Sequence, residues 1–211
     1  MSSSPLVHVV DDDDSLRTAV VRLLTAAGLE VRAYASAGDF LLHPLPQGPG
    51  CLLLDLRMPG PSGLELQRAL QNLGATLPVI FFTAHADVAC SVEAMKAGAV
   101  DFLMKPVEPQ VLLDAVHRAL ERDRLLRAAR ADAQDLRARF ALLTQREREV
   151  FDLVVAGKLN KQIADELGIA ERTVKAQRAQ LMTKLGAESA AELGRLAERL
   201  QRLPEGPLDA R

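Results

Sequence analysis

The stretch Cys51-Leu-Leu-Leu-Asp55 places four apolar residues in a row directly before a carboxylate. A strand that is apolar on both faces is typical of a parallel sheet covered by helices on both sides. Further strand-like runs lie at 6–10, 29–33, 77–82 and 99–104, and amphipathic helical stretches lie between or after them at 14–27, 36–42, 63–73, 87–97 and 109–121. This alternation predicts a doubly wound α/β fold for residues 1–121.

Composition limits the class of protein. The 211 residues are 48% hydrophobic and 26% charged, which suffices for a sizeable core and argues against disorder. No run approaches the ~18 apolar residues of a membrane helix, and the first five residues lack the basic and apolar regions of a signal peptide. Two cysteines, Cys51 and Cys90, are too few for a disulfide framework or a four-cysteine zinc site. We therefore expect a cytoplasmic protein with no membrane partner.

Polar side chains follow four of the five predicted strands. They are Asp11, Asp12, Asp55, Thr83 and Lys105. Each alone is an ordinary turn residue, but the carboxyl ends of parallel strands share one edge of a sheet, where functional groups gather. Three crowded carboxylates favour a cation, and Mg²⁺ prefers oxygen ligands. A carboxylate beside a divalent cation and a lysine is suited to accept a phosphoryl group. We assign the neighbouring Asp13 and Asp14 to helix capping instead.

Four sequence motifs of the first 121 residues resemble those of a known protein family. Val9-Val10-Asp11-Asp12, Asp55-Leu-Arg-Met-Pro-Gly60, Phe82-Thr83-Ala84 and Lys105-Pro106 resemble, in order, the receiver domain of bacterial two-component response regulators. The resemblance implies a flavodoxin-like, five-stranded parallel sheet of order 2-1-3-4-5. It also implies a cis Lys105–Pro106 bond.

The same resemblance implies roles for individual residues. Asp55 is the expected phosphoacceptor and a sensor histidine kinase the expected donor. Mg²⁺ is expected on Asp11, Asp12, Asp55 and the carbonyl of Arg57. The residues expected to contact the phosphoryl group or to take part in the switch are Thr83, Lys105, Ala84 and Phe102. An ordinary core phenylalanine is the alternative for Phe102.

The C-terminal part of the chain differs in charge and pattern. Residues 1–120 carry 13 acidic and 8 basic residues, whereas residues 121–211 carry 15 acidic and 18 basic ones, which favours a polyanionic partner or a solvated helical surface. Residues 122–143 contain neither Gly nor Pro and are predicted to form a helical linker. Its apolar seam is either a dimer contact or a contact with its own domain. The seam residues are Leu126, Ala129, Ala133, Leu136, Phe140 and Leu143.

Residues 144–203 are predicted to form an all-helical domain, followed by a frayed tail at 204–211. Thr144 and Glu147 have the spacing of a capping box, and Asn160 is the predicted cap of a helix at 161–167. Gly168 then turns the chain into a helix at 171–185, and a last helix covers 188–202. Helix, glycine turn and helix at 161–185 predict a helix-turn-helix.

In that layout the second helix enters the major groove of DNA. Lys175 and Arg178 lie three residues apart on one face and are expected to reach guanine edges or phosphates, whereas Arg172, Thr173 and Asn160 are expected at the DNA backbone. A protein-binding helical module is the alternative.

The motifs Leu143-Thr-Gln-Arg-Glu-Arg-Glu-Val150, Asn160-Lys-Gln-Ile-Ala-Asp-Glu-Leu-Gly-Ile169 and Thr173-Val-Lys175 resemble the LuxR-type helix-turn-helix. Combined with the receiver motifs, they resemble the FixJ-like branch of response regulators. Gln177 is also expected to contact DNA, although it stands where the family commonly has His. Ala170 precedes the recognition helix where a Ser or Thr cap is common.

The resemblance implies a phosphorylation-activated transcriptional regulator that dimerises and binds double-stranded promoter DNA. By analogy with the branch, RNA polymerase is a further expected partner. A phosphate-ester hydrolase of the haloacid dehalogenase type needs a second Asp two residues after the first, where this chain has Arg57. The sequence also lacks a phosphate-binding Gly-x4-Gly-Lys-Ser/Thr loop, so we expect no enzyme. No metal is assigned to His8, His43, His85 or His117.

Overall fold

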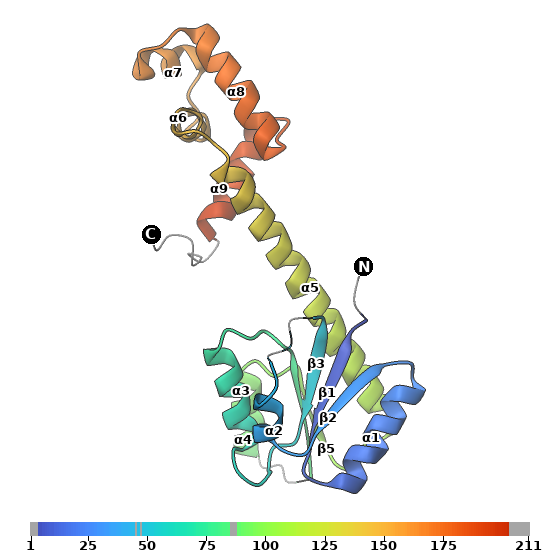
Figure 1. Ribbon diagram of the computed structural model, residues 1–211. Helices are drawn as coiled ribbons and strands as arrows, with labels where there is room; N and C mark the ends of the chain where they lie inside the picture. The colour runs from blue at the N-terminus through green and yellow to red at the C-terminus, as the bar shows by residue number, and fades with distance from the viewer. Residues whose placement is uncertain (1–3, 45, 47, 85–87, 203–211) are drawn as a thin grey trace. The chain divides into compact units, whose positions relative to one another are not determined.

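The computed structural model describes residues 4–44, 46, 48–84 and 88–202 (Figure 1). His85 and the tail at 204–211 therefore lie outside the described residues. The chain divides into two compact units, Met1–Arg127 and Ala128–Arg211. Among the described residues, none of the helices combines the length and apolar character needed to cross a lipid bilayer.

The first unit contains a five-stranded parallel sheet of order β2-β1-β3-β4-β5, which confirms the predicted fold. The strands are β1 (Leu6–Val10), β2 (Glu30–Tyr34), β3 (Gly50–Leu54), β4 (Val79–Thr83) and β5 (Asp101–Met104). The predicted runs at 77–82 and 99–104 began too early. Parallel pairing with β3 starts at Val79, and the carbonyl of Pro78 accepts a hydrogen bond from the Leu52 amide.

Helices cover both faces of the sheet (Figure 1). They are α1 (Asp14–Ala26), α2 (Ala37–Leu41), α3 (Gly63–Asn72), α4 (Val88–Lys96) and α5 (Pro109–Ala141). Side chains of α1 and α5 pack on one face, and those of α2, α3 and α4 pack on the other. The inner strands β1, β3 and β4 are therefore buried on both sides, as the apolar run at Cys51–Leu54 indicated, whereas the edge strands β2 and β5 are partly exposed.

The predicted helices at 109–121 and 122–143 form one continuous helix, α5, because neither Gly nor Pro interrupts it. Asp123 ties this helix to the first unit. Its carboxylate is 1% exposed and accepts hydrogen bonds from the Gly50 amide at 2.9 Å and from Arg127 Nε at 2.7 Å. The helix thus belongs to the α/β unit as far as Arg127.

The second unit contains the end of α5 and the helices α6 (Gln145–Val155), α7 (Asn160–Leu167), α8 (Glu171–Leu185) and α9 (Ala190–Arg202). The predicted capping box is confirmed: Glu147 N donates to Thr144 Oγ1, and Thr144 N donates to the Glu147 carboxylate. The apolar seam predicted for the linker is exposed at Leu126, near its start. Leu136 and Leu143, in its second half, are buried. The last helix starts at Ala190, two residues later than predicted, with the Ser189 hydroxyl at its N-terminus.

The prediction that Asn160 caps α7 is wrong. Asn160 is the first residue of the helix, and Leu159 occupies the cap position. The Leu159 amide donates to Gln162 Oε1 at 2.8 Å, and no side chain at the cap position accepts from the first turn of α7. The Asn160 side chain is thereby left available for a contact with α8.

Candidate functional site

Three charged side chains meet at the carboxyl-terminal edge of the sheet. Lys105, which follows β5, places its ammonium 2.6 Å from Asp11 Oδ2 and 2.8 Å from Asp55 Oδ2. Asp11 follows β1 and Asp55 follows β3, and the Asp55 amide donates to the Val10 carbonyl. Pairing of β1 with β3 therefore sets the two carboxylates side by side, as the strand-end rule predicted.

Asp12 completes an acidic cluster with these residues. Carboxylate oxygens of Asp11, Asp12 and Asp55 lie within 4.8 Å of one another. Asp11 and Asp55 are buried while Asp12 is exposed, so the cluster is open on one side. Burial raises the pKa of the Asp11 carboxyl above its ordinary value, and the hydrogen bond from Lys105 only partly opposes this rise.

The chemistry of this cluster fits a hard divalent cation. All three side chains offer oxygen, and Mg²⁺ is commonly bound through a few carboxylates while it keeps several waters. The exposed side at Asp12 leaves room for those waters. Arg57, expected to contribute its carbonyl, donates its amide to Asp55 Oδ1 at 3.3 Å. The main chain after β3 therefore curls back onto the Asp55 side chain.

The remaining predicted residues of this edge lie on β4 and β5 or just after them. Thr83 ends β4 and is fully buried, and its carbonyl accepts from the Lys105 amide at 2.9 Å. Ala84 follows it and is exposed. Phe102 is partly buried on β5, with its ring centroid 6.0 Å from that of Phe81. The Lys105–Pro106 peptide bond is cis, as predicted.

Sequence reasoning missed one residue of this site, Gly63. A Cβ at Gly63 would lie 2.2 Å from the Asp55 carbonyl oxygen and 3.0 Å from a ring carbon of Phe81. The first residue of α3 must therefore be glycine for the chain to pass this close to Asp55. Only the distance between two elements reveals this requirement, since the neighbouring sequence shows an ordinary helix start.

In the second unit, α7, a left-handed Gly168 and α8 form the predicted helix-turn-helix. Arg172, Thr173 and Lys175 are exposed on the first turns of α8. No side chain caps this helix at Ala170, in agreement with the missing Ser or Thr. Lys175 pairs with Glu171 one turn earlier, at 3.0 Å.

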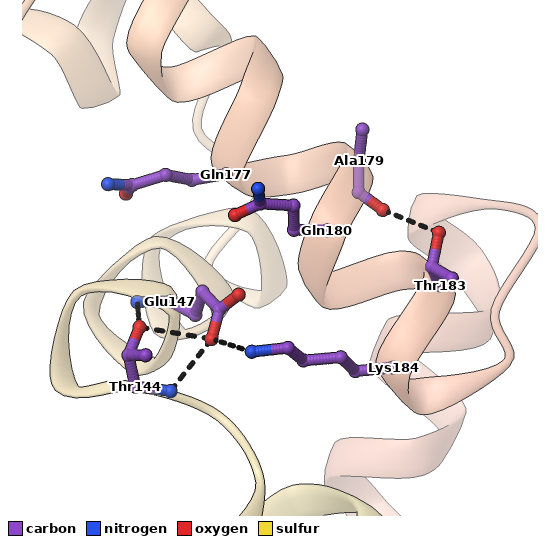
Figure 2. A pocket seen from close by; sticks show the side chains of 7 residues that line it. All are labelled: Thr144, Glu147, Gln177, Ala179, Gln180, Thr183 and Lys184. Atoms are coloured by element: carbon purple, nitrogen blue, oxygen red, sulfur yellow. Dashed lines mark hydrogen bonds and ion pairs between the residues drawn. The ribbon is translucent and has the colours of Figure 1, made fainter.

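Two other predicted contact residues, Arg178 and Asn160, bind each other, and Gln177 lines a groove. Arg178 Nη1 donates to Asn160 Oδ1 at 3.0 Å, which joins α8 to the first residue of α7. Gln177 is half-buried and lines a groove of about 490 Å³ between α6 and α8, together with Gln180 and Lys184 (Figure 2). Gln177 Oε1 is buried without a hydrogen-bond partner among the described residues.

The floor of this groove contains an ion pair between the buried Glu147 carboxylate and the partly exposed Lys184. Glu147 accepts hydrogen bonds from the Thr144 amide and hydroxyl, and from Lys184 Nζ at 2.7 Å (Figure 2). The hydrogen bond from Lys184 and that from the Thr144 amide hold the pKa of the Glu147 carboxyl below its ordinary value. The carboxylate thus stays charged and joins the start of α6 to the end of α8.

Comparisons with known proteins agree with this architecture. Residues 7–117 match the response regulator receiver domain, and residues 141–197 match bacterial regulatory proteins of the luxR family. Nodulation protein W of Bradyrhizobium diazoefficiens is 47% identical over 199 residues, which cover 94% of this chain and 88% of that protein. Transcriptional regulatory protein FixJ of Rhizobium meliloti is 46% identical over 191 residues, which cover 90% of this chain and 94% of that protein.

Solved structures agree as well. The response regulator StyR is 48% identical with a TM-score of 0.85, and the match covers 93% of this chain and all of StyR. Full-length FixJ from B. japonicum is 40% identical with a TM-score of 0.57, covering 96% of this chain and all of that chain. Both matched families are regulators rather than hydrolases, so the enzyme alternative is excluded. The chain therefore belongs to the FixJ branch of two-component response regulators, transcriptional regulators that join a receiver domain to a LuxR-type helix-turn-helix domain.

Proposed function

We propose that Asp55 accepts a phosphoryl group from a sensor histidine kinase and that this transfer turns on promoter binding. The observation that carries the proposal is the contact of Lys105 with both Asp11 and Asp55. In this scheme the receiver covers residues 1–121, a helical linker 122–143, the DNA-binding domain 144–203 and a C-terminal tail 204–211.

In the transfer itself, a carboxylate oxygen of Asp55 forms a bond to phosphorus as the bond from phosphorus to the kinase imidazole breaks. The imidazole nitrogen leaves with the bonding electrons, and the product on Asp55 is an acyl phosphate. Lys105 offers its ammonium to the phosphoryl oxygens, where charge accumulates in the transition state. Mg²⁺ on Asp11, Asp12, Asp55 and the Arg57 carbonyl would neutralise further negative charge.

The switch is proposed to involve Thr83, Ala84 and Phe102. The buried Thr83 hydroxyl lies on the strand end beside Lys105, and the small Ala84 leaves the approach to Asp55 open. Phe102 is only partly buried, so an inward turn of its ring would bury more of its apolar surface. Phosphorylation then favours one of two arrangements of this edge by adding charge to it.

Dimerisation is proposed to follow from that change. Helix α4 and the end of β5 expose four large apolar side chains, Val88, Val92, Met95 and Met104, of which Val88 is 79% and Met104 58% exposed. Exposed apolar surface of this kind supports a protein contact. A symmetric dimer would present two recognition helices to a pseudo-palindromic promoter site.

DNA contact is proposed for α8. Arg172, Thr173 and Lys175 are its exposed N-terminal residues, whereas Gln177 lies at the edge of the groove. Arg178 and Asn160 act as a bonded pair near the DNA backbone. Since promoters and RNA polymerase are cytoplasmic in bacteria, we propose that compartment and that polymerase as a partner.

The test uses the full chain with and without beryllofluoride, a phosphoryl mimic, in the presence of Mg²⁺. The proposal expects the mimic to produce a dimer in light scattering and tighter binding to a duplex selected from a random-sequence pool. Binding should weaken steeply with added salt, because phosphate contacts release counterions. An unchanged mass together with unchanged DNA affinity contradicts the proposal.

A further inference from the structure

The last turns of α5 and α8 hold each other through two hydrogen bonds of opposite direction. Arg139, near the end of α5, donates from Nη1 to the Leu185 carbonyl at the end of α8, at 2.8 Å. Lys184 on α8 donates from Nζ to the carbonyl of Leu142, just after α5, at 3.2 Å. We call these two side chains, Arg139 and Lys184, the clasp. All four residues belong to the second unit.

The Arg139 side of the clasp lies close against the end of α8. Its guanidinium also forms an exposed ion pair with Asp135, one turn earlier, at 2.7 Å. Gly186 is left-handed at φ 68°, and a Cβ there would lie 2.9 Å from Arg139 Nη1. The last carbonyls of a helix lack partners within the helix, and a cation at that end also favours the helix dipole. Arg139 therefore caps the recognition helix from outside it.

The Lys184 side of the clasp is also internal. Its ammonium binds the Glu147 carboxylate, which is 4% exposed, while Lys184 itself is 34% exposed (Figure 2). A lysine on a recognition helix is ordinarily counted as a phosphate contact. Here the ammonium contacts the end of α5 and the start of α6.

From these contacts we infer that Arg139 and Lys184 are positioning residues for DNA recognition, which set the orientation of α8 against the ends of α5 and α6. They do not touch DNA. The inference rests on the proposed function, in which α8 reads the promoter. Bases are read only when a side chain meets the base edge in the right geometry, whereas phosphate attraction tolerates a displaced helix.

The test measures binding to two duplexes: one selected from a random pool by the beryllofluoride-treated wild type, and a scrambled version of it. Arg139→Met is expected to weaken binding to the selected duplex about tenfold, close to the lower limit for a charged hydrogen bond, while binding to the scrambled duplex stays within twofold. Lys184→Met is expected to do the same, with an unchanged salt slope. Arg139→Lys, which keeps a donor, should restore part of the loss.

Two further variants serve as controls for the DNA-binding measurements. Asp135→Asn removes the exposed ion pair but not the bond to Leu185, so wild-type binding is expected. Arg172→Met removes a proposed phosphate contact and should lower the salt slope by about one unit on both duplexes. Circular dichroism and melting curves confirm folding, and if a methionine variant is unfolded, Arg139→Lys must still show a selective loss on the selected duplex.

Three results would overturn the inference that Arg139 and Lys184 position α8. The variants could weaken binding to both duplexes equally or to neither, or the salt slope could fall by about one unit in Lys184→Met. If the wild type selects no duplex at all, the proposed function fails instead, and the two failures are thereby distinct.

Discussion

Lys105 lies between two carboxylates that are 94 and 50 residues away in the sequence, with its ammonium 2.6 Å from Asp11 Oδ2 and 2.8 Å from Asp55 Oδ2. One ammonium thus neutralises part of the charge that burial makes costly. The same contact places a cation where a phosphoryl group on Asp55 would bring its oxygens. Structural need and proposed chemistry therefore coincide in one side chain.

Replacing the proposed nucleophile tests the transfer directly. Asp55→Asn keeps the shape of the side chain but cannot form an acyl phosphate, so incorporation of ³²P from the kinase or from acetyl phosphate should vanish. The increase in DNA affinity produced by phosphodonor should vanish with it. A variant that still becomes labelled would mean that another residue is the acceptor.

Metal binding is predicted to depend on Asp12 and not on its neighbour Asp13. Asp12 is exposed and belongs to the acidic cluster, whereas the Asp13 side chain accepts from the Ser15 and Leu16 amides at the start of α1. Mg²⁺ should raise the melting temperature of the wild type, because a ligand that binds only the folded state stabilises it. Asp12→Asn should lose most of that rise.

Asp13→Asn is the matched control for the metal experiment. Asparagine caps helices as well as aspartate does, so this variant should fold and keep its response to Mg²⁺. An equal loss of response in both variants would point to the general negative charge of the region rather than to a site.

Gly63 should tolerate no side chain. Gly63→Ala brings a Cβ to 2.2 Å from the Asp55 carbonyl, so either α3 or the Asp55 backbone must move. We expect a loss of about 2–4 kcal/mol of unfolding free energy, at or above the usual cost of overpacking, and slower phosphorylation. Urea unfolding and labelling rates measure the two effects.

Gly38→Ala is the control for crowding, because a Cβ at Gly38 would have Ser36 Oγ as its nearest neighbour, at an ordinary contact distance of 3.7 Å. Alanine has a higher helix propensity than glycine, so stability should stay equal or increase by up to about 1 kcal/mol. Similar destabilisation at both positions would refute the close-approach argument.

His8 should make the first unit sensitive to acid. Burial, followed by the charge of Arg32, lowers the pKa of the His8 imidazole from 6.5 to about 4. The unfolded chain therefore takes up the proton first, and stability that is complete above pH 6.5 is lost as the pH falls toward 4. The loss amounts to at most about 3–4 kcal/mol. His8→Phe should show a flatter dependence of unfolding free energy on pH between 6.5 and 4, and equal slopes would contradict this assignment.

The sequence by itself determined the features that depend on neighbouring residues. Apolar runs indicated the strands, and the Thr144–Glu147 spacing predicted the capping box that the structure contains. Five polar residues at strand ends predicted the acidic edge, because parallel strands all end on the same side of a sheet. Such signals are readable since each involves residues a few positions apart or one rule of topology.

Only the tertiary structure decided which side chains meet. Asn160 is of a residue type that often caps helices, yet its side chain accepts a hydrogen bond from Arg178, which lies 18 residues away. Gly63 is confined by Asp55, and Arg139 reaches a carbonyl 46 residues along the chain. These contacts depend on how packed elements approach one another, and that approach is set by the summed shapes of many side chains rather than by any local period in the sequence.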